Sequence, residues 1–267
     1  MGPIRGNIIF KSKHPDGDIL IVERDGARYL YLGSNAIQSA MDLQQPNRLT
    51  LTYTQRMMAF LLFTQAPQQC LLLGLGGGAL AKALYSTFPK SRLDAVELRE
   101  DIISVAHSHF FLPCNERINI ILDDAYNFTQ QKTRQGIKKY DTILVDAYDQ
   151  NGLAPCVKQE NFYNHCHLLL KQHGVLAINM WATSSHQLRQ HIKELKRIFQ
   201  TRPLCLPVPE KGNIIVFVTH NPQQEKSLKQ LNNHAKQLET EFNLPFTTYL
   251  KQLIKHNQQS WLQKFFN

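Results

Sequence analysis

Residues 69–79 read QCLLLGLGGGA, in which a short apolar run leads into a turn with four glycines and then into a helical pattern. Glycine has no side chain, so such a turn lets the backbone approach a ligand closely, and the positive end of the following helix attracts negative charge. Open α/β sheets bind nucleosides and dinucleotides at turns of this kind. We therefore predict ligand binding at Gly74, Gly76, Gly77 and Gly78, and the rest of the sheet must decide which ligand it is.

Apolar strands alternate with helical patterns after this turn. Strands that are almost continuously apolar are typical of a parallel sheet covered by helices on both faces. Two later β-rich runs are joined by PEKG, a hairpin signal. An antiparallel hairpin at the end of a parallel sheet favours a Rossmann-like, doubly wound α/β fold of the S-adenosylmethionine-dependent methyltransferase type over the nicotinamide-binding type. The predicted strands are CLLLGL, LDAVEL, INIILDD, YDTILVDAY, VLAINMW, PLCLPV and NIIVFVT, and the predicted helices include residues 78–88, 100–111, 158–172 and 185–199.

The chain is predicted to divide into three parts. Short extended runs, NIIF, DILIVE and RYLYLG, are separated by turn-prone residues and indicate a small N-terminal β domain over residues 1–48. A helical pattern over 49–63 opens the Rossmann-like nucleoside-binding catalytic domain, which we place at 49–220. The polar, Gln- and Lys-rich segment 221–267 is predicted to form a C-terminal helical extension.

The composition excludes several classes of protein. Of the 267 residues, 43% are hydrophobic and 19% charged, which is too apolar for a disordered chain. The sequence has neither an apolar stretch of about 18 to 20 residues nor a secretory signal, so we expect a cytoplasmic protein without membrane contact. Five cysteines without a CxxC pair predict reduced thiols and no metal site. The net charge of +9 is spread along the chain, which favours a solvated basic surface over a nucleic-acid-binding one.

Carboxylates follow the second and third strands of the predicted sheet. Glu97 ends the second strand, 23 residues after Gly74, where it can accept hydrogen bonds from both hydroxyls of a ribose. The third strand ends in Asp123-Asp124-Ala125, and its carboxylates lie where the amino group of an adenine can be recognised. The alternative for Asp124 is that it caps the helix that follows.

Two further acids, Asp146 and Asp149, follow the fourth strand at the same edge of the sheet. One carboxylate can orient a cationic group while the other accepts a proton from an incoming amine. We assign the proton-accepting role to Asp149, because it lies beyond the end of the strand, and ligand binding to Asp146.

Together these segments resemble the spermidine synthase family of polyamine aminopropyltransferases over about residues 16–220. The segments that carry the resemblance are YLYLGSNAIQS, LTYTQRMM, LLLGLGGGALAKAL, AVELRED, LDDAYNF, YDTILVDAYDQNGL and ENFY. The resemblance implies a small β domain before a Rossmann-like domain, assembly as a homodimer, and transfer of an aminopropyl group from decarboxylated S-adenosylmethionine to a polyamine acceptor, a small-molecule amine. The donor is a co-substrate, so no tightly bound cofactor is implied.

The resemblance also implies roles for individual residues. Glu97 would hold the ribose, Asp124 and Ala125 the adenine, and Gln55 the aminopropyl group of the donor. Asp149 would deprotonate the attacking amine. Tyr53 and Gln38 would line the channel for the amine.

The chain departs from the family pattern at four places. Gln150 stands where the family has a proline directly after its second acid. Gly77 stands where the family has an aspartate in its glycine-rich turn, Asp16-Gly17 where it has a Tyr-Gln pair, and Trp181 where it has an acid for the far end of a diamine. These departures keep two alternatives open. One is methyl transfer from intact S-adenosylmethionine to a small molecule or RNA, and the other is a catalytically degenerate nucleoside-binding protein.

Overall fold

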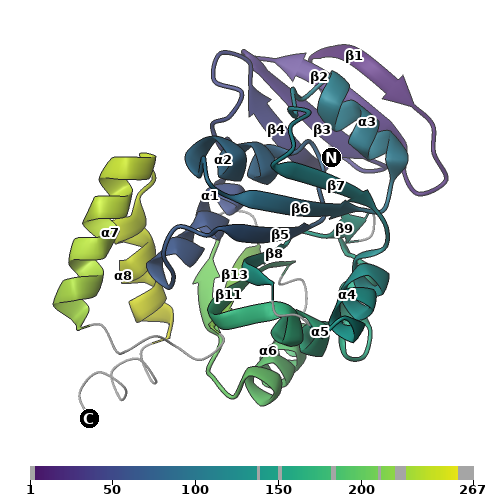
Figure 1. Cartoon of the computed structure of the whole chain (residues 1–267). Coiled ribbons are helices and arrows are strands. Elements are labelled where there is room, and N and C mark those ends of the chain that lie inside the picture. Colours follow the sequence, from purple (N-terminus) through teal and green to yellow (C-terminus); the bar gives the residue numbers. More distant parts are fainter. Residues whose placement is uncertain are drawn as a thin grey trace.

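A seven-stranded sheet forms the centre of the protein in the computed structural model, which describes residues 4–136, 139–149, 152–181, 185–209, 212–219 and 227–257 (Figure 1). Its strand order is β12-β13-β11-β8-β5-β6-β7. The five strands from β11 to β7 run parallel, β13 pairs antiparallel with β11, and β12 pairs antiparallel with β13. The predicted doubly wound sheet with a terminal hairpin is therefore confirmed. The strands are β5 (Gln69–Leu73), β6 (Arg92–Glu97), β7 (Ile118–Leu122), β8 (Tyr140–Val145), β11 (Leu170–Trp181), β12 (Leu204–Pro207) and β13 (Asn213–Thr219).

Helices cover both faces of this sheet. Alternate residues of β5 enter different cores, Cys70 and Leu72 on one face and Leu71 and Leu73 on the other, which explains the unbroken apolar run. The first face carries α1 (Thr52–Met57), the 3-10 helix η1 (Met58–Leu62), α2 (Ala79–Thr87), α7 (Leu228–Phe242) and α8 (Phe246–His256). The second carries α4 (Ala125–Arg134), the 3-10 helix η2 (Pro155–Lys158), α5 (Phe162–Leu169) and α6 (Ser185–Phe199).

An N-terminal antiparallel sheet, drawn in purple in Figure 1, packs against α3 (Glu100–Ser108). Its core joins Ile19, Ile21 and Leu30 to Ile102 and Val105 of the helix. Its fourth strand is missing from the sequence prediction, because IQSAMD lacks the alternation of β-branched and aromatic residues that marks a strand. The sheet consists of β1 (Asn7–Ser12), β2 (Ile19–Arg24), β3 (Ala27–Leu32) and β4 (Ile37–Asp42) in that order.

The predicted helix over 158–172 is wrong at both ends. Asn161 has a φ of 69°, a left-handed conformation that prevents a continuous helix from entering Phe162. The helix ends at Leu169 because Leu170 already pairs with Tyr140 in the sheet. His173, with a φ of 66°, lies in an irregularity of β11. The helical pattern over 49–63 likewise divides into α1 and η1.

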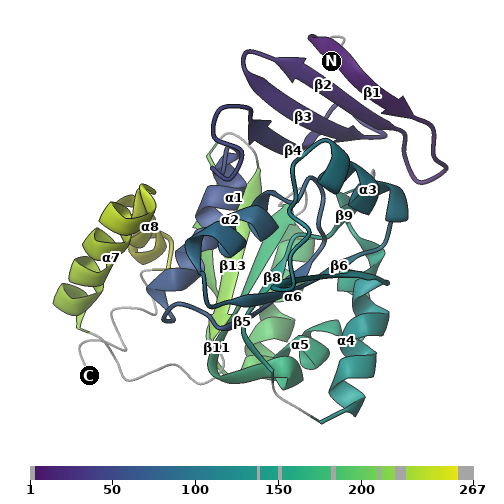
Figure 2. The same ribbon diagram turned by 45° about the horizontal axis from the view of Figure 1, so that its top comes forward.

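The last two described helices, α7 and α8, are part of the main core. Phe246, Leu250 and Leu253 of α8 are buried and join the core that includes η1. The side chain of Arg56 on α1 is 5% exposed, and its Nη1 donates to Oε1 of Gln252 on α8 at 2.6 Å. In both Figures 1 and 2 these helices lie on the side opposite the short strand β9 (Tyr148–Asp149). None of the helices in the described ranges has the length and apolar character that crossing a membrane requires.

Candidate active site

The glycine turn brings β5 very close to the end of β8. The backbone nitrogen of Gly74 donates to the carbonyl oxygen of Val96 at 2.9 Å, and its φ is 95°. A Cβ on Gly74 would lie 2.4 Å from the carbonyl oxygen of Asp146, so only glycine fits between the two strands. A Cβ on Gly76 would meet only Cβ of Ser39, at 4.0 Å. The turn therefore joins two strand ends at Gly74 and borders open space at Gly76.

The position of Gly77 is crowded by its neighbours. A Cβ there would lie 2.7 Å from Oγ of Ser39 and 3.0 Å from Cδ1 of Phe110. Ser39 belongs to β4 and is buried. A side chain at position 77, such as the aspartate of the family pattern, would require Ser39 to move.

Glu97 ends β6 beside the glycine turn and is held by backbone groups. Its Oε2 accepts a hydrogen bond from the backbone nitrogen of Leu75 at 2.9 Å, and its Oε1 accepts one from that of Arg99 at 3.1 Å. Burial raises the pKa of Glu97, and these hydrogen bonds counteract the rise. Backbone hydrogen bonds from Gly76 and Leu98 act in the same direction, and the contact of Glu97 with a ribose stays a prediction.

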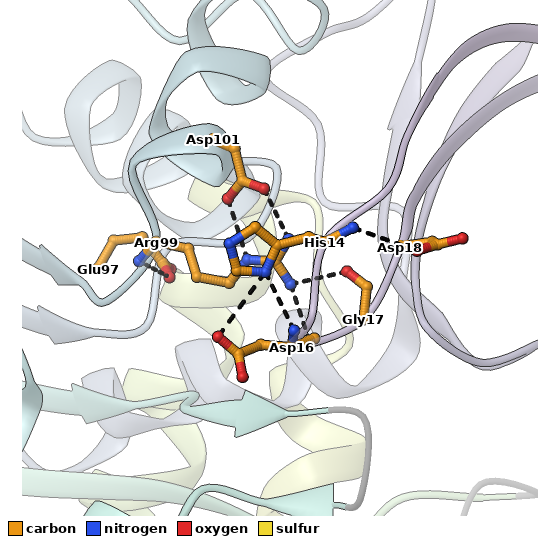
Figure 3. Close-up of polar contacts among 7 residues, drawn as sticks. All are labelled: His14, Asp16, Gly17, Asp18, Glu97, Arg99 and Asp101. Carbon is orange, nitrogen blue, oxygen red and sulfur yellow. Dashed lines mark hydrogen bonds and ion pairs between the residues drawn. The ribbon is translucent and has the colours of Figure 1, made fainter.

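Arg99 ties the loop between β1 and β2 to the turn that holds Glu97 (Figure 3). Its Nη1 donates to the carbonyl oxygens of Asp16 and Gly17, both at 3.0 Å. Its Nε and Nη2 donate to the two carboxylate oxygens of Asp101 at 3.0 and 2.7 Å, and this pairing lowers the pKa of Asp101. The Asp16-Gly17 segment, where the chain departs from the family pattern, therefore lies fixed at this edge of the sheet.

Asp124 caps α4. Its Oδ1 accepts hydrogen bonds from the backbone nitrogens of Tyr126 at 2.9 Å and Asn127 at 3.1 Å. The capping alternative is therefore a fact of the structure, and the adenine contact of Asp124 and of the buried Ala125 stays a prediction. The two roles are compatible, because a carboxylate can accept about four hydrogen bonds.

Asp146 lies at the end of β8 among polar partners. Its Oδ1 accepts from Nδ2 of Asn179 at 2.8 Å, and its Oδ2 lies 3.3 Å from the hydroxyl of Tyr53. Burial raises the pKa of Asp146 to about 6, although both hydrogen bonds lower it. The hydroxyl of Tyr53 also lies 3.1 Å from the carbonyl oxygen of Gln38. Tyr53 and Asp146, far apart in the sequence, are thus in contact.

The sequence analysis missed Asn179 and its partners. Asn179 is 2% exposed, and its Oδ1 accepts from Nδ2 of Asn213 at 2.9 Å. Its carbonyl oxygen accepts from the hydroxyl of Tyr148 at 2.9 Å. The available signal was the one amide side chain in the apolar strand VLAINMW, since a buried amide needs hydrogen-bond partners.

Asp149 borders a pocket of about 440 Å³. It belongs to β9, which pairs with β10 (Gly152–Leu153). Gln38 borders the same pocket, so Tyr53, which lies between Gln38 and Asp146, connects the pocket to the strand ends. Asp124 also approaches this region, because the negative charges of Asp124 and Asp149 both contribute to raising the pKa of the buried Cys156 to about 12. Burial is the larger cause of that rise.

Two features do not join this arrangement. The side-chain nitrogen of Gln55 donates to the carbonyl oxygen of Leu49 at 2.8 Å, and its contact with an aminopropyl group stays a prediction. A hollow of about 480 Å³ lies at the opposite edge of the sheet, where β5 and β6 begin. Asp94 in that hollow is paired with Lys139 at 2.7 Å. Because the glycine turn follows the end of β5, this hollow is separate from it.

Comparison with known proteins identifies the family. Residues 50–230 match the family described as "Spermine/spermidine synthase domain". A polyamine aminopropyltransferase of Neisseria meningitidis serogroup A is 31% identical over 249 residues, 92% of each chain.

Solved structures show the same fold. A spermidine synthase in complex with the transition state analogue AdoDATO has a TM-score of 0.70 and 14% identity over 91% of this chain and 84% of its own. Human methyltransferase-like protein 13 in complex with SAH has a TM-score of 0.67 and 23% identity over 73% of this chain and 93% of its own. At these identities the solved structures show the fold alone, whereas the family match and the Neisseria relative show which family the chain belongs to. The chain belongs to the spermine/spermidine synthase family.

Proposed function

We propose that this protein is a transferase that moves an aminopropyl group from decarboxylated S-adenosylmethionine to a small-molecule amine and releases methylthioadenosine. The observation that carries the proposal is the position of the pocket bordered by Asp149, which Tyr53 connects to the strand ends beside the glycine turn. Family membership and the aminopropyltransferase relative support the same reaction.

The donor would bind along the carboxyl edge of the sheet. Glu97 would accept hydrogen bonds from the ribose hydroxyls, a role supported by its position beside the backbone of Leu75. Leu98 follows it and is 64% exposed, so its apolar side chain is available to cover one face of the adenine. The remaining proposed donor contacts are Gln55, Gly74, Gly76, Gly77, Gly78, Asp124, Ala125 and Asp146.

Transfer needs positioning and one base. The lone pair of a neutral amine attacks the methylene carbon bonded to the sulfonium sulfur, the carbon–sulfur bond breaks, and its electron pair leaves on the sulfur of methylthioadenosine. Asp149 would accept the proton that the amine loses. Gln38 and Tyr53 would position the amine, since in-line placement supplies much of the rate in such a displacement.

Methyl transfer from intact S-adenosylmethionine is the second candidate function. Gly77 supplies no carboxylate for the ammonium of an aminopropyl group, and its surroundings leave no room for one without movement of Ser39. The fold alone does not distinguish the two reactions, because the methyltransferase structure is as similar as the spermidine synthase.

The test compares donors and a matched pair of variants. We expect calorimetry to show tighter binding of decarboxylated S-adenosylmethionine than of the intact molecule, and chromatography to show methylthioadenosine release in the presence of amines. Asp149→Asn should lose at least about 100-fold in transfer rate while it still binds methylthioadenosine. Glu116→Gln, an exposed acid at the opposite edge of the sheet, serves as the control. Tighter binding of the intact donor with release of S-adenosylhomocysteine would establish methyl transfer instead.

We also propose that the protein acts as a homodimer in the cytoplasm, in line with the family resemblance, and that its basic surface is solvated. Light scattering on a sizing column should give twice the chain mass of 30.8 kDa, and the single-chain mass would contradict the dimer.

A further inference from the structure

The pocket that contains Asp149 is nearly balanced in charge. Among its described lining residues, Asp149 is the one carboxylate and Lys158 is a cation. The third titratable group, His191, has its pKa lowered first by burial and then by the charge of Lys158. Its Nδ1 lies 2.7 Å from the hydroxyl of Tyr163, and this contact holds the ring in place. The pocket therefore offers one anionic partner, and the field of Lys158 reaches its interior.

The rest of the lining is apolar or uncharged. Trp181 is 43% exposed and its ring lies 6.5 Å from that of Tyr148, at an angle of 50°. Leu153 and Leu188 add apolar surface, and the side chain of Gln38 adds an amide. Such a wall accommodates a hydrocarbon chain with an uncharged polar end.

A molecule with two positive ends would be poorly matched here. A second ammonium placed away from Asp149 would be partly desolvated without a carboxylate from the described lining, which is unfavourable. A cation–π contact with the face of Trp181 would raise the affinity for this ammonium by about two- to five-fold at most at an exposed site, and Lys158 would repel it.

We propose that this pocket selects an amine that carries a single positive charge over a diamine that is charged at both ends. This inference rests on the proposed aminopropyl transfer and specifies its acceptor. Asp149 holds the reacting amine, and the far end of the acceptor lies against Trp181 and the uncharged lining.

The experiment measures four acceptors of equal chain length: butylamine, 4-aminobutan-1-ol, 4-aminobutanoate and butane-1,4-diamine. Methylthioadenosine release gives kcat/KM for each, and calorimetry on the protein loaded with methylthioadenosine gives their affinities. We expect both measures to favour at least one of the three singly cationic amines over the diamine by about ten-fold. Equal or better use of the diamine would overturn this inference and leave aminopropyl transfer intact. Failure of every amine to release methylthioadenosine would overturn the proposed function, and the affinities alone would then decide whether the pocket discriminates by charge.

Two variants of one position separate charge from shape. Trp181→Asp adds a second carboxylate at a half-exposed site, and Trp181→Asn removes the ring without adding charge. The aspartate variant should shift the diamine-to-monoamine ratio of kcat/KM toward the diamine by about ten-fold relative to the asparagine variant. The same ratio in both variants would show that charge at this wall does not set acceptor choice and would overturn the inference.

Discussion

Asp146 and Asp149 are three residues apart, yet they occupy contrasting environments. Asp146 is held by Asn179 and Tyr53 at the end of β8, whereas Asp149 borders the pocket. The first is therefore suited to organising the site and the second to proton transfer. The sequence could suggest this division, because one acid directly follows the strand and the other lies beyond it. It could not show the partners of Asp146, since they come from distant segments.

The raised pKa of Asp146 predicts a pH-dependent stability. Because the folded-state pKa of about 6 lies above the usual value near 4, the folded state binds the proton more tightly than the unfolded state. The stabilisation that this tighter proton binding gives to the folded state is present below about pH 4 and is lost as the pH rises through 6. Asp146→Asn cannot ionise, so its stability relative to the natural protein should increase between pH 4.5 and 7.5. Urea unfolding midpoints at both pH values measure this, and a constant difference would contradict it.

A second prediction concerns the effect of Gly74 on stability. Gly74→Ala places a Cβ against the backbone of Asp146 in a left-handed conformation, so we expect a loss of about 3 kcal/mol of unfolding free energy. Gly26→Ala is the matched control, with a φ of 73° but nothing within 4 Å of the added Cβ. It should cost about 1 to 2 kcal/mol from backbone strain alone. Equal losses in urea unfolding would show that the close approach of β5 and β8 is not what requires glycine.

Among the secondary-structure elements, the loop between β1 and β2 shows how the N-terminal sheet contributes to the nucleoside site. Arg99 holds the carbonyl oxygens of Asp16 and Gly17, and its own backbone nitrogen holds Glu97 (Figure 3). The two sheets therefore meet at the residue proposed to bind ribose.

We expect Arg99→Ala to weaken methylthioadenosine binding about three- to ten-fold, because the loop and the turn around Glu97 lose their common anchor. Calorimetry measures the affinity. Arg24→Ala is the control, since Arg24 lies over the ring of Tyr29 within the N-terminal sheet. An unchanged affinity in Arg99→Ala would mean that the loop has no part in donor binding.

Elements buried on both faces were the ones that the sequence predicted well. The strands from β5 to β8 are rich in apolar residues, and the glycine turn marks the first crossover, so their order along the chain was readable. Strand β4 was not, because IQSAMD lacks the alternation that marks a strand and its pairing with β3 is a contact that the local pattern does not encode. The boundary at Leu169 was not readable either, since the pairing of Leu170 with Tyr140 is a contact between distant residues that helical periodicity does not encode.

At the scale of the whole molecule, α7 and α8 contribute more buried side chains to the core than their polar composition suggests. Each presents a narrow apolar stripe to the core and a polar face to solvent, so the average composition hid the buried residues. Leu253 is fully buried among them, while Lys255 is exposed.

Leu253→Ala should therefore lower the unfolding free energy by about 2 to 5 kcal/mol, whereas Lys255→Ala should change it by less than about 0.5 kcal/mol. Denaturant unfolding monitored by circular dichroism gives both values. A loss below 1 kcal/mol for Leu253→Ala would mean that α8 docks only loosely.

The contact between Arg56 and Gln252 joins α1, which carries Tyr53 and Gln55, to a helix almost two hundred positions later. Arg56 also lies over the ring of Tyr249, 5.2 Å from its centre. During translation, α1 leaves the ribosome long before its partner is made. Until α8 has been synthesised, α1 therefore lacks this partner, and we expect Tyr53 to reach its final position beside Asp146 only after that point.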